Sequence, residues 1–411
     1  MLRFLERWAV DGRLVFVVFL LTVFGIAMVY SAGAVNTPTP DVVDAWRKQA
    51  LWFGLALVTF SLTARIPLPW WEWIAVPAYV LSLVLLAATL VIGTGAGTAE
   101  STKSWIGFGG FRFQPSELAK IATVLALARL LANRQEPPTG LRDLFAPGLL
   151  VGAPLGFTLL EGDLGSALAF IGLLYTMLYW AGTPPFLLIM VASPVAGLFL
   201  SFDTRIWSGY IVILFLVLYL YRYRLFLYES AVVILVNIAA GAIASPLWNS
   251  LKPYQQNRLL VFLDPTVDPR GAGYNLMQSK VAIGSGGLTG KGYLLGTQKR
   301  FDFLPEQHTD FIFSVVGEEL GFLGAGLALI TFGYILYRLV RMAEEANDPF
   351  AGLVLFGIFG VWLVHIFVNV GMTVGLVPIT GIPLPFVSYG GTFLLTCWLA
   401  VAMAARLAHE E

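Results

Sequence analysis

Apolar runs of membrane-spanning length recur along almost the entire chain, and they restrict its possible folds more than any other feature. The 411 residues are 58% hydrophobic and 12% charged, whereas soluble domains carry roughly 25% charged residues. A helix needs about 20 apolar residues to cross a bilayer, so we predict an all-α, polytopic membrane helix bundle of ten to twelve transmembrane helices, forming one integral membrane domain over residues 1–411. The twelve candidate spans are 14–34, 48–64, 71–93, 115–133, 144–160, 164–181, 185–202, 206–221, 225–248, 311–337, 350–375 and 386–407.

The placement of arginine predicts which ends of these spans face the cytoplasm. With the N-terminus inside, most short basic segments become cytoplasmic, as the positive-inside rule requires. Arg205 and the pair Arg47 and Lys48 would lie outside and count against this orientation. The first apolar run is longer than the core of about 7–15 residues in a signal peptide, so we interpret it as an uncleaved span. Both termini are therefore expected in the cytoplasm. The inner arginines are Arg3, Arg7, Arg13, Arg65, Arg129, Arg134, Arg142, Arg222, Arg224, Arg338, Arg341 and Arg406.

This orientation leaves two longer segments outside, 94–114 and 249–310. The second is predicted to be a large extracytoplasmic loop that carries the active site, because much of the chain's charge is concentrated there. A net charge of zero gives no indication of nucleic-acid binding, and a single cysteine excludes a disulfide framework or a cysteine-based metal site. The ionisable residues of the loop are Lys252, Arg258, Asp264, Asp268, Arg270, Lys280, Lys291, Lys299, Arg300, Asp302, Glu306, His308 and Asp310.

Asp264 ends a short pattern of apolar and polar residues that predicts an amphipathic helix at the membrane interface. A carboxylate at that place could take a proton from a sugar hydroxyl. Asp before Pro265 is also a common helix N-cap followed by a proline at the first helical position. The local sequence favours the capping role and leaves catalysis as the alternative.

The glycine-rich stretch 271–292 contains two lysines and follows this helix. It is either a flexible loop or an anion-binding segment in which Lys280 or Lys291 contacts a phosphate group. The spacing of a P-loop is absent and no strand precedes the glycines, so this stretch is not a P-loop. We expect no nucleotide and no organic cofactor. Arg258 is a third candidate for anion contact.

The segment 304–319 carries further acidic residues into the following span. Glu306, His308 and Asp310 could bind a divalent cation such as magnesium or manganese, although their spacing is loose. Thr309 or Asp310 could instead cap the helix that follows. Glu318 and Glu319 lie within the span, where carboxylates are costly and usually face a cavity or a partner.

Glu117 and Lys120 open the fourth span three residues apart, so they share one face of the helix. A self-satisfied ion pair that anchors the bundle is the favoured interpretation. The alternative is that they line a polar cavity that opens outward. Lys103 and Trp105, just upstream, are expected at the same outer surface, where the tryptophan can be an interfacial anchor.

Several ordered motifs together resemble one bacterial family. They are Arg258-Leu-Leu-Val-Phe-Leu-Asp264-Pro, Gly-Ala-Gly-Tyr-Asn-Leu-Met-Gln278-Ser-Lys280, Gly-Ser-Gly-Gly-Leu-Thr-Gly-Lys291-Gly with Gly296-Thr-Gln298, Leu-Pro-Glu306-Gln-His-Thr-Asp310-Phe-Ile-Phe, Gln114-Pro-Ser-Glu117 with Lys120, Asp163-Leu-Gly165, and Pro383-Leu-Pro-Phe-Val-Ser388-Tyr-Gly-Gly391. These motifs are similar to those of the SEDS proteins, named for shape, elongation, division and sporulation. Gly-Lys-Gly followed by Gly-Thr-Gln resembles the elongation branch more than the division branch.

The resemblance implies a peptidoglycan glycosyltransferase of the bacterial cytoplasmic membrane that polymerises lipid II during cell elongation. It places the family's essential loop aspartate on Asp264, implies a general base there, and implies a class B penicillin-binding protein as partner. The chain departs from the family at Ser104, where an arginine is common, and in its span count, since the family usually has ten spans. The surplus lies between Pro185 and Trp248, and two added spans keep the sidedness of the loop.

Two rival functions remain open at this stage. A flippase or transporter of the lipid-linked precursor would use Glu117, Lys120, Glu318 and Glu319 as cavity charges. A non-catalytic scaffold would only recruit the penicillin-binding protein. Formation of glycan polymer by the purified protein separates both from the enzyme.

Overall fold

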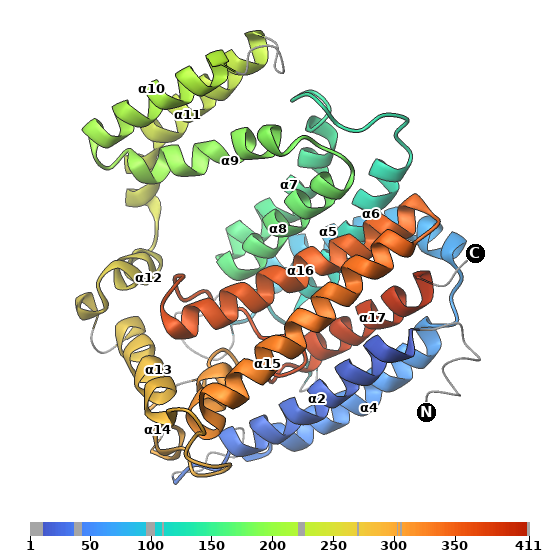
Figure 1. The fold of residues 1–411 in the computed structure, drawn as a ribbon, viewed down its shortest axis with the longest axis vertical. Coiled ribbons are helices and arrows are strands. Elements are labelled where there is room, and N and C mark those ends of the chain that lie inside the picture. Colours follow the sequence, from blue (N-terminus) through green and yellow to red (C-terminus); the bar gives the residue numbers. More distant parts are fainter. Residues whose placement is uncertain are drawn as a thin grey trace. The chain divides into compact units, whose positions relative to one another are not determined.

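A computed structural model describes residues 11–36, 43–95, 103–108, 111–220, 227–268, 271–301, 303–304 and 306–408 (Figure 1). Six residues used above, Arg3, Arg7, Arg222, Arg224, Arg270 and Asp302, lie outside these ranges. Residue 221 of one predicted span and residues 225 and 226 of the next also lie outside them. In order, the elements are α2 (Gly12–Ala32), α4 (Ala45–Thr63), α5 (Leu68–Ile92), β1 (Ile106–Phe108), β2 (Phe111–Phe113), α6 (Pro115–Ala132), α7 (Phe145–Glu161), α8 (Leu164–Trp180), α9 (Pro185–Leu200), α10 (Thr204–Leu220), α11 (Leu227–Ser250), α12 (Pro253–Leu263), η1 (Pro265–Val267), α13 (Ala272–Gly286), α14 (Thr297–Arg300), α15 (Ile312–Glu345), α16 (Pro349–Val374) and α17 (Gly391–Leu407).

Each of the twelve predicted spans coincides with a helix, which confirms the all-α, multi-pass membrane fold. Within the described ranges, five helices are long and apolar enough to cross a membrane: α2, α5, α11, α15 and α16. The apolar helices α7 to α10 and α17 have 16 or 17 residues. At 1.5 Å per residue they are about 24–26 Å long, slightly shorter than a bilayer core of about 30 Å.

The backbone contacts divide the chain into two compact units. One unit comprises residues 1–133, 150–177 and 257–411, and the other comprises residues 134–149 and 178–256. In the larger unit, α15 packs along α16, α16 packs on α6, and α17 packs on α4 (Figure 1). Trp398 of α17 is fully buried between the rings of Phe53 and Phe60. In the smaller unit, α11 packs on α9 and both contact α10.

The three helices predicted between 185 and 248 are therefore present as α9, α10 and α11, and a buried amide joins them. Asn237 of α11 donates from Nδ2 to Ser193 Oγ of α9 at 2.8 Å. Its Oδ1 accepts from the hydroxyl of Tyr210 of α10 at 2.7 Å. A polar side chain in an apolar helix is satisfied here by its neighbours, as burial requires.

The segment before α17 departs from the prediction. The span was expected to begin at residue 386, but the helix begins at Gly391. Residues 382–388 are instead a buried, non-helical stretch in which Phe386 has a positive φ of 66°. Such backbone is tolerated at membrane depth only inside protein. Gly25 of α2 makes room for it, because a Cβ there would meet the backbone of Phe386 and Val387.

Candidate functional site

Asp264 lies at the end of α12 and begins the short helix η1. The predicted amphipathic helix is confirmed over Pro253–Leu263. The predicted cap is confirmed too, because Asp264 Oδ1 accepts from Thr266 N at 2.9 Å and from Thr266 Oγ1 at 2.7 Å. These two hydrogen bonds, the hydroxyl's first, lower the pKa of Asp264 below its ordinary value. The side chain is exposed, so the turn presents an ionised carboxylate to its surroundings.

The turn that carries Asp264 is mounted on the N-terminal end of α13. Gly273 packs so closely on this turn that a Cβ would meet the carbonyl oxygens of Pro265 and Asp268. Gly273 N donates to Asp268 O at 3.1 Å, and Gly271 N donates to Asp268 Oδ1 at 3.0 Å. The position of Asp264 therefore depends on the position of α13.

α13 is in turn fixed to α15 and α16 by a buried hydroxyl pair. Ser279 Oγ lies 2.6 Å from Ser314 Oγ of α15 and donates to Thr373 O of α16 at 2.7 Å. Lys280, the next residue, is exposed. Its side chain lies over Gly375, the left-handed cap of α16 with φ of 79°, where a Cβ would meet the ammonium group. Lys280 is thus the predicted anion-binding lysine that remains on the surface.

A second polar centre forms around Asp310. Its pKa is raised from 3.8 to about 7, first by burial and then by the carboxylates of Glu306 and Asp163. Arg258 of α12 and a hydrogen bond with Thr309 oppose this shift. Arg258 and the proposed cation ligands Glu306 and Asp310 are therefore close enough to interact electrostatically. The predicted helix cap is wrong, because α15 begins after Phe311 without a side-chain cap.

The family-like motifs meet in this region although they are far apart in sequence. Asp163 Oδ2 accepts from Gln114 Nε2 at 3.1 Å, and Asp163 Oδ1 caps α8 through Ser166 N at 2.9 Å. Ser388 Oγ donates to Thr309 O at 2.6 Å. The loop before α15 is thereby docked on the segment before α17.

Two buried amides that the sequence analysis missed support the same region. Asn369 Nδ2 donates to Asp310 O at 2.9 Å and to Ile382 O at 2.7 Å. Gln49 Nε2 donates to Ser388 O at 3.1 Å, and its Oε1 accepts from Gly390 N at 3.1 Å. Their signal was present, since an amide inside an apolar span requires a partner.

The glycine-rich segment pairs its backbone with α15. α15 is broken at Gly321, whose φ is 65°. On one side of the break, Lys291 N and Gly292 N donate to the carbonyls of Glu318 and Glu319 at 3.0 and 2.9 Å. On the other, the N–H groups of residues 322 and 323 donate to the carbonyls of residues 287 and 288 at 2.9 and 3.1 Å. The predicted flexible loop is therefore wrong for this stretch, and these N–H groups are not free to bind phosphate.

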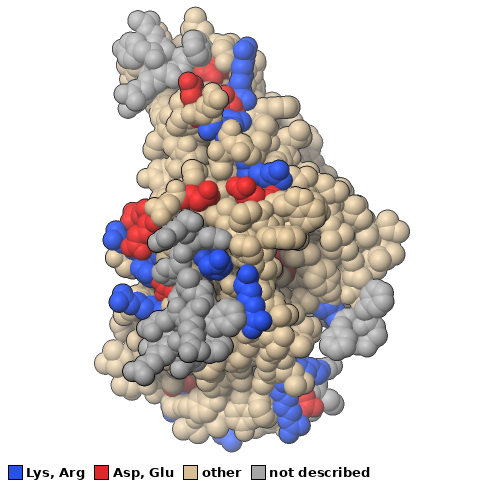
Figure 2. Space-filling model, turned by 90° about the vertical axis from the view of Figure 1, so that its right-hand side faces the viewer, with Lys and Arg blue, Asp and Glu red and all other residues tan. Residues whose placement is uncertain are grey.

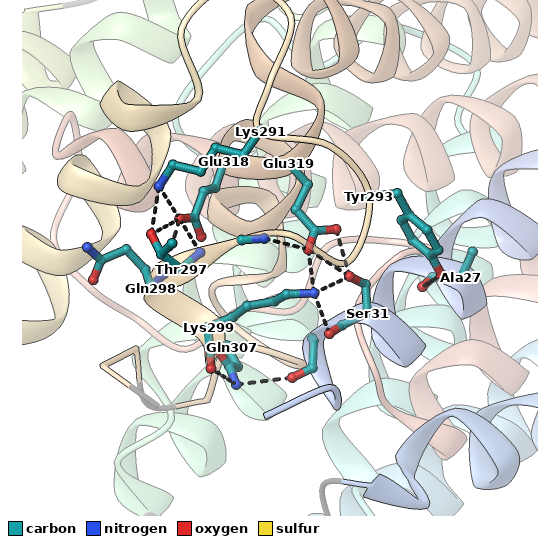
Figure 3. Close-up of polar contacts among 12 residues, drawn as sticks. Ala27, Ser31, Lys291, Tyr293, Thr297, Gln298, Lys299, Gln307, Glu318 and Glu319 are labelled. Carbon is teal, nitrogen blue, oxygen red and sulfur yellow. Dashed lines mark hydrogen bonds and ion pairs between the residues drawn. The ribbon is translucent and has the colours of Figure 1, made fainter. Parts of the chain in front are cut away.

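Glu318 and Glu319 have the partners that their position in a span requires (Figure 3). Glu318 Oε1 lies 2.6 Å from Lys291 Nζ and accepts from Thr297 N at 2.8 Å. Glu319 forms an ion pair with Lys299 and accepts from Ser31 Oγ of α2 at 2.6 and 2.8 Å. Lys291, predicted to contact an anion, is thus engaged by Glu318.

Lys299 is the missed member of this network. It is completely buried and donates to Ser31 O at 2.7 Å. Gln307, also buried, donates to Ala32 O at 3.1 Å. Burial lowers the pKa of Lys299, and the hydrogen bond with Glu319 opposes that shift. The network attaches the loop to the end of α2 and to the break of α15.

Glu117 and Lys120 form the predicted buried ion pair, with 2.8 Å between Nζ and Oε1. His365 of α16 is a third member, because its Nε2 lies 2.9 Å from Lys120 Nζ and its Nδ1 lies 3.0 Å from Pro383 O. Since the carbonyl can only accept, Nδ1 carries the proton and Nε2 accepts from the lysine. Glu117 and Lys120 also line a small cavity of about 30 Å³ with a mostly apolar wall.

Lys103 lies at the start of a hairpin that the sequence did not predict. Strands β1 and β2 pair antiparallel with Ile106 opposite Phe113, and Trp105 pairs with Thr94. Lys103 is exposed and Ser104 beside it is buried. The hairpin connects α5 with α6, and so with Gln114 and Glu117.

The predicted divalent cation finds no cage of protein ligands. Among the described residues there is no group of three or more histidine, cysteine or acidic side chains able to hold a metal ion. Glu306, His308 and Asp310 do not form one, and the ring of His308 instead lies 5.6 Å from that of Tyr389.

The first and last described helices meet at one end of the larger unit. At one end, Asp11 N donates to Ala405 O at 3.4 Å, and Arg338 binds the carboxylate of Asp11 at 2.8 Å. The start of α2, the end of α17 and the end of α15 are therefore together. The face seen in Figure 2 corresponds to the side of Figure 1 on which α2 begins, and it carries basic and acidic side chains among a largely uncharged surface.

Comparison with known proteins places these features in one family. The family described as cell cycle protein, FtsW/RodA/SpoVE, matches residues 12–228 and 186–411. The chain is 36% identical over 388 residues to the probable peptidoglycan glycosyltransferase FtsW of Geobacter metallireducens, with 93% of this chain and 90% of the relative covered. It is 35% identical to the peptidoglycan glycosyltransferase RodA of Treponema pallidum, with 96% of each covered. It is 34% identical to the peptidoglycan glycosyltransferase MrdB of Escherichia coli K12, with 90% and 86% covered.

Solved structures give the same result. A chain from a study of how a peptidoglycan synthase complex coordinates polymerization and crosslinking has a TM-score of 0.70 and 29% identity over 97% of both chains. The rod shape-determining protein RodA of Thermus thermophilus has a TM-score of 0.63 and 26% identity, over 97% of this chain and 96% of that one. The predicted resemblance is thereby confirmed: the chain belongs to the FtsW/RodA/SpoVE family of SEDS proteins.

Proposed function

We propose that this protein is a peptidoglycan glycosyltransferase that polymerises lipid II into glycan strands during cell elongation. The names of its relatives and its full-length similarity to them support the activity. The observation that carries the assignment to a residue is the exposed, ionised carboxylate of Asp264, held in a capped turn on α13.

In this reaction, Asp264 acts as the general base on the acceptor. Its carboxylate takes the proton from a sugar hydroxyl, and the oxygen attacks the anomeric carbon of the lipid-linked donor glycan. The bond from that carbon to the pyrophosphate oxygen breaks, and the polyprenyl pyrophosphate leaves with the electron pair. The carboxylate of Asp264 accepts the proton as the new C–O bond forms, when the attacking hydroxyl has become acidic.

The leaving pyrophosphate requires positive charge near it. Lys280 is the favoured contact because it is exposed on the helix that carries the Asp264 turn. Arg258, on the helix before Asp264, is the second. Magnesium needs only one or two carboxylates when substrate phosphates complete its shell. A divalent cation therefore remains a proposal, and no step here depends on it.

We further propose that the protein lies in the bacterial inner membrane with both termini in the cytoplasm. The adjacency of Asp11 and Ala405 supports the same side for both ends of the described chain. Arg338 and Arg341 of α15 are at that end, as the positive-inside rule expects for the cytoplasm. The loop with Asp264 would then face outward, next to a class B penicillin-binding protein that crosslinks the strands.

The test is polymerisation of lipid II by purified protein carrying Asp264→Asn. The neutral amide keeps the size of the side chain but cannot take a proton, so glycan polymer should fall by at least about 100-fold, the lower range for loss of a general base. Asp203→Asn is the matched control, because Asp203 also caps a helix, through Arg205 N at 2.8 Å, in the other unit. Polymer at the wild-type rate from Asp264→Asn would remove this residue from the mechanism. Lipid II movement without any polymer in the wild type would favour the flippase.

A further inference from the structure

We propose that two ion pairs, Lys291–Glu318 and Lys299–Glu319, position Asp264 by fixing the base of α13. We call them the lysine–glutamate clamp. The inference rests on the proposed function, since it concerns the residue assigned to catalysis. It also reassigns Lys291, which the sequence proposed as an anion contact, to a positioning role.

The clamp acts at the point where α13 joins the core. α13 ends at Gly286, which packs so tightly that a Cβ would meet the carbonyl oxygens of Gly317 and Glu318. The next residues run along the break in α15 and donate to the same Glu318 and Glu319 carbonyls. The backbone of each glutamate therefore holds the loop, and its side chain holds a lysine of that loop.

Each half of the clamp has a different degree of burial. Lys299 and Glu319 are both 0% exposed, and Ser31 of α2 bonds to both (Figure 3). Lys291 is 26% exposed and Glu318 is 1% exposed. Glu318 also accepts from the backbone N–H of Thr297 and Gln298, at 2.8 and 3.1 Å. Each carboxylate accepts from several donors, so neither glutamate needs a ligand to explain its burial.

Geometry links this base to the catalytic carboxylate. α13 has 15 residues, so it is about 22 Å long at 1.5 Å per residue. The Asp264 turn lies at its far end, in direct contact through Gly273. Ser279 anchors α13 about 10 Å from that end, so a tilt of about 10° about this anchor moves the Asp264 turn by about 2 Å. A misplacement of about 1 Å can lower an enzymatic rate roughly 100-fold, so a small change at the clamp is sufficient to disable Asp264.

A positioning role and an anion-binding role predict different kinetics for Lys291. If Lys291 bound pyrophosphate, Lys291→Met would raise the KM for lipid II, and Glu318→Gln would release the lysine and leave binding intact. If both residues position α13, both variants lower kcat by about 10-fold with KM within about 2-fold. The double variant should then be no worse than either single one, because the residues act as one unit.

The same comparison applies to the buried pair. Lys299→Met alone strands a buried carboxylate, and such a variant can fail to fold. The double variant Lys299→Met/Glu319→Gln leaves no unpaired charge, and we expect it to fold and to lose about 100-fold in kcat. Arg341→Met/Glu344→Gln is the matched control, since this pair is also on α15 but is about half exposed.

A distance measurement tests positioning without relying on activity. Spin labels at Val267→Cys on η1, next to the far end of α13, and Phe367→Cys on α16, both exposed, report the position of the Asp264 turn in a Cys397→Ala background, which removes the one native cysteine. In full-length protein without substrate, the clamp variants should shift or broaden the distance by about 2 Å or more, and the control should not.

Unchanged distances in the folded clamp variants would overturn the proposal, whatever the rates. A rise in KM confined to Lys291→Met would overturn it for that pair. Failure of the proposed function has a separate signature. Asp264→Asn would then polymerise normally, while the spin-label distances would still respond to the clamp.

Discussion

Substituting Asp310 by asparagine should make the protein more stable at alkaline pH. Burial and the carboxylates of Glu306 and Asp163 raise the pKa of Asp310 from 3.8 to about 7. The folded protein therefore holds a proton that the unfolded chain releases at a lower pH. Asparagine cannot ionise, so it removes the penalty of a charged side chain at this position.

The sign and size follow from linkage. Below pH 3.8, Asp310 is protonated in both the folded and the unfolded protein. The stability that the protonated side chain gives the folded state is therefore fully present there. As pH rises from about 4 to 7, the unfolded state loses its proton first, so the free energy of unfolding decreases and levels off above pH 7. A shift of about 3 pKa units corresponds to about 4 kcal/mol at most. Since the side chain is partly exposed, solvent screening reduces this, and we expect about 2 kcal/mol.

Thermal unfolding of detergent-purified protein between pH 4.5 and 8.5 measures this effect. Asp310→Asn should unfold at a higher temperature than the wild type at pH 8 and at nearly the same temperature at pH 4.5. Glu306→Gln should lower the pKa of Asp310 and move the transition window to lower pH, whereas Arg258→Met should move it upward. The reasoning fails if Asp310→Asn is destabilising at pH 8, or if its effect does not depend on pH.

Three further outcomes are expected. Gly321→Ala should lower the free energy of unfolding by at least about 2 kcal/mol, because the φ of Gly321 is 65° and a Cβ there would meet the backbone of residues 288 and 290. Gly326→Ala is the control, since this glycine of the same helix has open space around it. In thermal melts, Gly326→Ala should be neutral or stabilising. Lys120→Met should lower the free energy of unfolding by about 3–5 kcal/mol, because it leaves Glu117 buried without its ion-pair partner. The double variant Lys120→Met/Glu117→Gln should unfold at a temperature closer to that of the wild type. Equal stability of the single and the double variant would contradict the ion-pair argument. Chelation of divalent cations should reduce lipid II polymerisation and added magnesium should restore it, and a rate that is indifferent to chelation would exclude the proposed cation.

The helices were predictable from the sequence because their signal is local. Apolar length located all twelve, and the apolar–polar pattern before Asp264 identified α12. The cap at Asp264 and the ion pair of Glu117 with Lys120 were also predictable, because both join residues only two or three positions apart. The non-helical stretch before α17 was not, since its apolar residues are buried in protein and have the same composition as a span.

The partners of charged residues across long separations could not be predicted. Glu319 pairs with a lysine 20 positions earlier and with Ser31, which is 288 positions away, and no local rule selects these partners from the loop's many charges. The sequence nevertheless contains one constraint on the partner of the broken helix. A helix that breaks within a membrane must satisfy the backbone groups it releases, and the break at Gly321 needs donors on one side and acceptors on the other. Only a segment that approaches backbone to backbone supplies both, and glycines at 286 and 290 permit that approach. This span contains a glycine and two carboxylates, and a glycine-rich loop with lysines precedes it. The pattern therefore predicts that the backbone of the loop forms hydrogen bonds with the groups released at the helix break. This takes precedence over phosphate binding, because the same N–H groups cannot do both.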